Sequence, residues 1–117
     1  MTEKWTQLFA SVTRAAQSET FESPYLSDVA NLLYSLNLVQ PFDWSHWGVP
    51  FEEPKDLWQL DINDCIRHIT RIVRSDRFCE GNLHLATRSG TLAKLCLVAF
   101  ERTGGTRAPK LEEVVAN

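Results

Sequence analysis

Four arginines within eleven residues form the part of this sequence whose residue types and spacing could do chemistry. Arg67, Arg71 and Arg74 stand at positions i, i+4 and i+7, so on a helix their side chains share one face. Arg77 follows three residues later. Guanidinium groups bind phosphate and carboxylate oxygens through paired hydrogen bonds. Converging arginines of this kind would hold a phosphate, a nucleotide or an acidic segment of a partner protein.

Carboxylates near the same stretch support a second interpretation. Asp76 and Glu80 alternate with the arginines, and Glu52, Glu53 and Asp56 lie upstream. A structural ion-pair network would use these carboxylates to neutralise the arginines, which is the commoner arrangement. Exposed ion pairs contribute only about 0–1 kcal/mol each, so stability alone is a weak reason for such a dense cluster. The sequence leaves both interpretations open.

Other site chemistry has less support. Asp76, Glu80 and His84 are spaced four residues apart and are competent metal ligands. Gly81 interrupts their run, however, and no second ligand pair follows, so we expect no metal and no cofactor. Cys79 is the only cysteine in a polar context, but the sequence places no base beside it. No glycine-rich phosphate loop is present, and no catalytic residue is assigned.

Aromatic residues interrupted by prolines fill the segment 41–58. Its large aromatic side chains are Phe42, Trp44, Trp47, Phe51 and Trp58. Proline at this density excludes a long helix, and aromatics at this density exclude a disordered linker. We therefore expect an ordered loop with one helical turn at 43–47. Its aromatic rings would complete the core or, beside the arginines, form a recognition patch that could also stack on a base.

Apolar residues recur at helical spacing through the rest of the chain. The pattern predicts helices at 2–18, from 24 to near 37, at 61–74, at 83–88 and at 91–102. Asp61 is the expected N-cap of the third helix, and Ser23 that of the second. Residues 75–80 are expected to form a turn. The predicted fold is all-α: a compact bundle of about five helices with an aromatic-rich ordered loop.

A single domain is expected at residues 1–102. Residues 103–117 would form a C-terminal tail that is mobile or docked through Leu111, Val114 and Val115. The chain has 117 residues, 44% of them hydrophobic, which suits one globular domain.

Charge and cysteine content limit the classes of partner. The net charge is −3, from 12 basic and 15 acidic residues, whereas binders of extended nucleic acid or membrane surfaces normally carry an excess of Lys and Arg. No apolar run approaches the ~18 residues of a membrane span, and the first residues do not resemble a signal peptide. The three cysteines, Cys65, Cys79 and Cys96, suggest reduced thiols. We expect a cytoplasmic protein.

Two phrases of the sequence carry a family resemblance. One is Pro41-Phe42-Asp43-Trp44-x-x-Trp47, and the other is Thr70-x-x-Val73-Arg74-x-Asp76-Arg77-Phe78-Cys79-Glu80-Gly81, followed by Leu83 and Ser89-Gly90. Over about residues 24 to 102 the sequence resembles a family of short prokaryotic proteins known as domain of unknown function 6508. The resemblance implies a small, mostly helical, cytoplasmic protein and supplies no catalytic role. Asn82 stands where the family pattern has His.

The leading functional hypothesis is a small, non-enzymatic binding or regulatory protein. It would hold an acidic protein partner or a small phosphorylated ligand, and an inhibitor of a host system carried by a phage or mobile element would fit its size. The expected binding residues are Arg67, Arg71, Arg74, Arg77, Trp44, Trp47, Asp76 and Glu80. The alternatives are a small enzyme acting on a nucleotide-like substrate, with Asp76 or Glu80 as acid/base, and a structural domain that works only as a homo-oligomer.

Overall fold

Helices and short helical turns make up the regular structure of the chain. The computed structural model describes residues 2–18, 24–78 and 81–112. In chain order the elements are α1 (Thr2–Gln17), α2 (Pro24–Ser35), the 3₁₀ turns η1 (Trp44–His46) and η2 (Leu57–Gln59), α3 (Ile62–Ser75), α4 (Asn82–Arg88) and α5 (Thr91–Thr103). These ranges contain no strand. The predicted all-α bundle of about five helices with an ordered aromatic-rich loop is confirmed.

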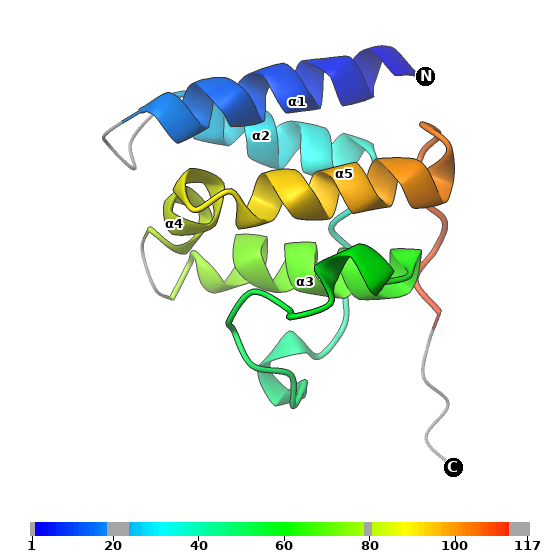
Figure 1. Cartoon of the computed structure of the whole chain (residues 1–117). Helices are drawn as coiled ribbons and strands as arrows, with labels where there is room; N and C mark the ends of the chain where they lie inside the picture. Colours follow the sequence, from blue (N-terminus) through cyan, green and yellow to red (C-terminus); the bar gives the residue numbers. More distant parts are fainter. Residues whose placement is uncertain (1, 19–23, 79–80, 113–117) are drawn as a thin grey trace.

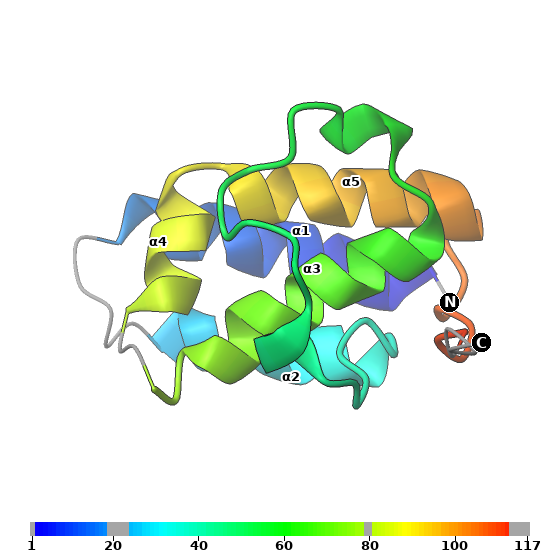
Figure 2. The same ribbon diagram turned by 90° about the horizontal axis from the view of Figure 1, so that it is seen from below.

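The helices stack in layers around α5. In Figure 1, α1 and α2 form the upper layer, α5 crosses the middle, and α3 lies below it. The short α4 closes one end of the bundle and contacts α1, α3 and α5. The loop between α2 and α3 lies on the outer side of α3, where it is seen in front of the bundle in Figure 2. The two residue classes of interest, arginines and loop aromatics, therefore meet at this outer surface.

The core is formed by the apolar faces of α1, α2, α3 and α5. Leu8, Ile66 and Leu95 are completely buried, and burial of each such side chain contributes about 1.5–3 kcal/mol. Trp5 is also buried, 5.4 Å from the Phe100 ring. This core gives α3 a fixed platform, with one face inward and the other toward the loop.

Two buried cysteines belong to this core. Cys65 on α3 and Cys96 on α5 are free thiols and completely buried. Burial raises the pKa of each thiol to about 12, so both stay protonated and behave as small apolar side chains. Cys79 lies outside the described residues.

Helix α3, which carries the arginines, begins as its sequence predicts. The Asp61 side chain accepts a hydrogen bond from the N–H of Asp64 at 2.8 Å, which satisfies one of the free donors of the first turn. Cys65, Ile66 and Ile69 point into the core. Because the apolar stripe fixes the rotation of the helix, it also decides which side chains face the loop.

The second helix ends two residues earlier than expected. Its last residue is Ser35, and Asn37 takes a left-handed conformation with φ 62°, which asparagine tolerates better than most residues. Leu38 and Val39 follow as buried loop residues. The expected cap, Ser23, lies outside the described residues.

The aromatic loop only partly follows the prediction. Its expected turn at 43–47 is confirmed by η1, and η2 adds a second turn. The interpretation that its aromatics complete the core is wrong for Phe51 and Trp58, which are 63% and 54% exposed. Leu57 occupies the buried position instead. The loop lies on polar side chains of α3 rather than on its apolar stripe, so its large rings stay near the surface.

The residues after α5 turn back onto the bundle. Ala108 and Leu111 are buried, and the N–H of Leu111 donates to Oε1 of Gln40 at 2.6 Å. Val114 and Val115, which the sequence also assigns to docking, lie outside the described residues. The segment through residue 112 therefore packs beside the start of the aromatic loop.

Candidate functional site

Arg71 does not belong to an exposed arginine face. Arg71 is only 2% exposed. Its guanidinium carbon lies 4.7 Å from the centre of the Trp47 ring and 4.4 Å from the centre of the Phe51 ring. It donates to the carbonyl oxygens of Val49 and, at 2.6 Å, of Pro50. Cation–π contacts contribute about 0.5–2 kcal/mol each. Arg71 thus holds the loop against α3, and its donors are not available to a ligand.

His68 lies one turn before Arg71 under the same loop. It is buried, and its ring centre is 4.7 Å from that of Trp47. Burial, assisted by the positive charge of Arg71, lowers the pKa of His68 to about 4, so the imidazole is neutral near pH 7. Burial also lowers the pKa of Arg71. Because His68 is neutral, it adds no second buried positive charge beside that of Arg71.

Arg67, at the other end of the row, already has partners. Its Nη1 donates to Asp64 Oδ1 at 3.1 Å, and its Nη2 donates to the carbonyl of Glu112 at 3.3 Å. It borders a hollow between the start of the loop and the residues that follow α5, together with Phe42 and Lys110. Arg67 therefore does not line the arginine pocket and instead connects α3 to the segment after α5 at Glu112.

Arg74 and Arg77 form the remaining part of the row. With Trp44, Ser45 and Phe78 they line a pocket of about 500 Å³, which we name the arginine pocket. The Trp44 and Phe78 ring centres are 6.1 Å apart and tilted by 41°. Phe78 is 81% exposed. The structure thus brings four residues of the recognisable sequence phrases together at one end of α3, where the loop and the following turn meet.

The guanidinium groups of the arginine pocket have no counter-charge among the described residues. Arg74 Nε is buried and finds no acceptor there, and neither Arg74 nor Arg77 forms an ion pair within 2–18, 24–78 and 81–112. A buried donor without an acceptor costs about 1–3 kcal/mol. The pocket is therefore positively charged and offers unused donors.

Asp76 does not turn back onto these arginines. Its Oδ1 accepts hydrogen bonds from the N–H groups of Gly81 and Leu83, both at 3.1 Å, at the start of α4. Gly81 itself has φ 97°, a conformation that favours glycine. The ion-pair interpretation is wrong for Asp76 and also for Glu53, whose carboxylate is paired with Lys94 at 2.9 Å.

Four predicted participants therefore do not line the arginine pocket: Arg67, Arg71, Trp47 and Asp76. Trp47 packs on Arg71 and His68, and Asp76 caps α4. Glu80 lies outside the described residues. Phe78 was part of the recognised phrase but was not predicted as a site residue. A large aromatic within a charged turn is the signal that could have identified it, because such a residue has little reason to be exposed unless it binds.

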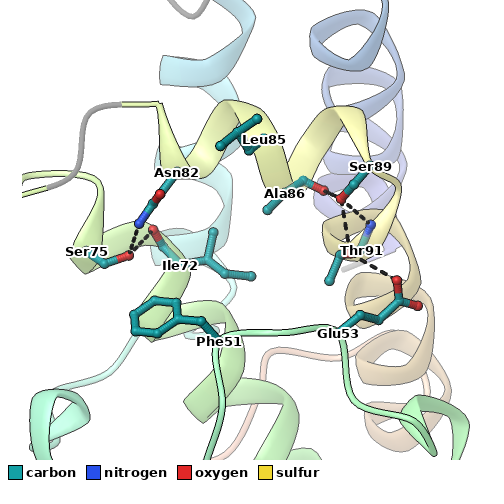
Figure 3. Close-up of a pocket in the computed structure, with 9 residues that line it drawn as sticks. All are labelled: Phe51, Glu53, Ile72, Ser75, Asn82, Leu85, Ala86, Ser89 and Thr91. Atoms are coloured by element: carbon teal, nitrogen blue, oxygen red, sulfur yellow. Dashed lines mark hydrogen bonds between the residues drawn. The ribbon is translucent and has the colours of Figure 1, made fainter.

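Another hollow lies near the arginine pocket and is shown in Figure 3. This groove, of about 380 Å³, runs between the loop and α4. Phe51 lines it from the loop, Ile72 from α3, and Leu85 and Ala86 from α4. Leu85 is 65% exposed. We name it the apolar groove. The sequence patterns drew attention to four of its lining residues, Phe51, Glu53, Asn82 and Ser89, but to none of them as part of a groove.

A polar cluster on η1 resembles a catalytic triad only in composition. Asp43 accepts from His46 Nδ1 at 2.9 Å, and Ser45 Oγ lies 3.3 Å from the same nitrogen. A serine triad needs the carboxylate on one ring nitrogen and the hydroxyl on the other. His46 and Asp43 are also exposed, with side chains 84% and 69% accessible. The hydrogen bonds from Ser45 and His46 lower the pKa of Asp43, and the cluster serves to order the turn.

The described part of the chain holds no group of three or more His, Cys, Asp or Glu side chains that could bind a metal ion. In that same part, no helix combines the length and the apolar character that crossing a bilayer requires.

The fold and these hollows define a class: a small helical protein with an arginine- and aromatic-lined pocket at one end of its central helices. A family model described as a family of unknown function, DUF6508, matches residues 16–101, and the chain belongs to this family. The resemblance noted in the sequence is thereby confirmed. Searches of curated proteins and of solved structures found no match.

Proposed function

We propose that the chain is a non-enzymatic binding protein whose arginine pocket holds the carboxylate or phosphate group of a partner. The observation that carries the proposal is the buried Nε of Arg74, which has no acceptor among the described residues. The pocket, which Arg74 and Arg77 both line, would bring an anion close to two guanidinium charges that have no carboxylate partner among the described residues. Guanidinium groups are suited to this task because they offer several donors in a fixed plane.

The aromatic rings of the pocket also support binding. Trp44 is half-buried and Phe78 is exposed at its mouth. Tryptophan and arginine are enriched among the residues that dominate binding energy at interfaces. A ligand group placed over these rings would gain apolar contact in addition to the hydrogen bonds of the arginines.

The position of Asp76 favours binding over catalysis. A general base needs a carboxylate that can reach the reacting group, but Asp76 Oδ1 already accepts two backbone N–H groups.

Cytoplasmic location remains part of the proposal. It is supported by the free thiols of Cys65 and Cys96, because structural disulfides form mainly in oxidising compartments.

Calorimetric titration with inorganic pyrophosphate and with a short oligoglutamate peptide would test the proposal. We expect at least one of these anions to bind the wild-type chain, with an affinity that falls as salt is added. Arg74→Gln and Arg77→Gln should each weaken binding about tenfold, which corresponds to about 1.4 kcal/mol.

Arg107→Gln provides the matched control, because Arg107 is an exposed arginine outside the arginine pocket. Its affinity should equal that of the wild type. Equal weakening by all three substitutions, or no binding of either anion to the wild type, would refute the proposed function.

A further inference from the structure

The apolar groove adjoins the arginine pocket at the same end of α3. Arg74 lines the pocket and Ser75 lines the groove. The Cα atoms of consecutive residues are about 3.8 Å apart, so the two hollows lie close together at this end of α3, on sides of the helix about 100° apart. A single bound segment could therefore reach both.

The polar groups of the groove are already satisfied by one another. Asn82 Nδ2 donates to Ser75 Oγ at 3.0 Å, and Thr91 Oγ1 donates to Glu53 Oε2 at 3.2 Å; Figure 3 shows both pairs. Lys94 completes the neutralisation of Glu53. What the groove offers a ligand is consequently its apolar wall, formed by Phe51, Ile72 and Leu85 in Figure 3.

Three exposed apolar side chains border the two hollows. Phe78, Leu85 and Phe51 are 81%, 65% and 63% exposed. Large apolar side chains that gather beside polar groups mark interaction surfaces. A free phosphate in the arginine pocket would leave all of them in water, whereas a polypeptide with apolar residues would cover them.

We propose that the partner is a segment of another protein in which an acidic residue stands near a large apolar residue. This inference rests on the proposed function of the arginine pocket. The acidic side chain binds Arg74 and Arg77, and the apolar side chain enters the groove against Ile72 and Leu85. Charge complementarity selects this occupant, because the pocket arginines have no carboxylate partner among the described residues.

The charge of the chain argues against an extended nucleic acid as the occupant. The net charge is −3, and binding of an extended nucleic acid needs a broad excess of basic residues. An acidic and apolar segment of a different protein satisfies both hollows, and a second copy of the chain is an outcome that the test below distinguishes.

Selection from displayed random peptides about a dozen residues long would test the inference. The bait is the full wild-type chain, with counter-selection against Arg74→Gln. We expect the selected peptides to share an acidic residue and a large apolar residue at a fixed spacing. In fluorescence anisotropy, Arg74→Gln and Leu85→Ser should each weaken binding of a selected peptide about tenfold.

Two matched variants control for nonspecific effects. Leu97 is an exposed leucine on α5, 45% accessible, and Arg107 is an exposed arginine after that helix. Leu97→Ser and Arg107→Gln should bind the selected peptide as the wild type does. Leu85 is already exposed, so Leu85→Ser should fold normally, and a circular dichroism melt checks this.

The possible failures are distinguishable. Peptides selected for acidic residues alone, with affinity unchanged by Leu85→Ser, would overturn the inference and leave the anion pocket intact. Failure to select any peptide that depends on Arg74 would also overturn it, while the pyrophosphate titration would still report on the pocket itself. Sedimentation that shows a dimer lost in Leu85→Ser would assign the groove to a second copy and reject a foreign partner.

Discussion

Arg71 and Arg74 are one turn apart on the same helix, yet they are in opposite situations. Arg71 is enclosed by Trp47 and Phe51, and its donors are bound to loop carbonyls. These loop carbonyls do not reach Arg74, whose Nε has no acceptor among the residues described. The first arginine fastens the loop to the helix, whereas the second is left with binding capacity.

The difference comes from what the loop covers. Carbonyl oxygens at 49 and 50 approach α3 at Arg71, and the rings beside them exclude water from its guanidinium. Buried charges are tolerated when hydrogen bonds and favourable contacts replace the lost hydration. Five residues before Val49 in the loop, Trp44 packs near Phe78 and forms one wall of the arginine pocket. The same loop therefore supplies hydrogen-bond acceptors to Arg71 and, through Trp44, a wall of the pocket that Arg74 lines.

Removal of the Arg71 side chain should cause the largest loss of stability. Arg71→Ala abolishes two charge-assisted hydrogen bonds and two cation–π contacts, so we expect the free energy of unfolding to fall by about 2–3 kcal/mol. Chemical denaturation followed by circular dichroism measures this. A loss no larger than that of Arg74→Ala would show that the two arginines are equivalent, which contradicts the comparison.

Acid should weaken the Arg71 side of the site through His68. Its folded-state pKa of about 4 lies below the ordinary value near 6.5, so the unfolded chain binds the proton more readily. The stabilisation is complete above pH 6.5 and is lost as pH falls toward 4. From pH 7.5 to pH 5 we expect the free energy of unfolding to decrease by about 2 kcal/mol from this group.

His68→Gln identifies the source of that pH dependence. Glutamine does not titrate, so the stability of this variant should change much less between pH 7.5 and pH 5 than that of the wild type. Denaturant titrations at several pH values measure the difference. A slope as steep as in the wild type would mean that another group takes up the proton.

Loss of the Asp76 carboxylate should have a smaller effect, confined to α4. Asp76→Ala leaves the N–H groups of Gly81 and Leu83 without their acceptor, and loss of such a cap costs about 1–2 kcal/mol. Anion binding by Arg74 should be unchanged. Hydrogen exchange should report faster opening of α4, and a gain in anion affinity would instead indicate that Asp76 had been neutralising the arginines.

The smallest stability effects are expected in the arginine pocket. Arg74→Ala removes a buried donor that lacks an acceptor, which stabilises the fold, and also removes the packing of the side chain, which destabilises it. Phe78→Ser replaces an exposed ring. Each substitution should therefore change the free energy of unfolding by less than about 0.5 kcal/mol. Thermal melts of the two variants and the wild type would detect a larger change in stability. A loss of 2 kcal/mol or more, roughly the size predicted for Arg71→Ala, would assign these residues to the fold rather than to binding.

The local features of the fold could be predicted from the sequence. The cap at Asp61 and the apolar stripe of α3 depend on neighbours three and four residues away, so the chain itself displays them. The turn at η1 follows from the prolines that exclude a long helix around it. The resemblance to the family was also visible in the sequence, because the two phrases on which it rests are each contiguous.

The partners of the arginines could not be predicted in this way. Helical spacing places Arg67, Arg71 and Arg74 on one face, but the contact of Arg71 with Val49 and Pro50 joins residues more than twenty positions apart in the chain. Asp76 looked like an ion-pair partner because it is adjacent in sequence, yet its geometry suits the first N–H groups of α4. Which arginine is covered depends on the path of the loop, and periodicity carries no information about that path.

The most direct test is NMR of the arginine Nε–Hε groups during a titration with inorganic pyrophosphate. If Arg71 holds the loop and Arg74 binds anions, the Arg74 signal should shift in a saturable manner, while the Arg71 signal stays in place. Arg77 should follow Arg74, although its exposed side chain will give a broader response. Equal shifts of Arg71 and Arg74, or a stationary Arg74 signal at saturating pyrophosphate, would contradict the division of this arginine row into a structural and a binding part.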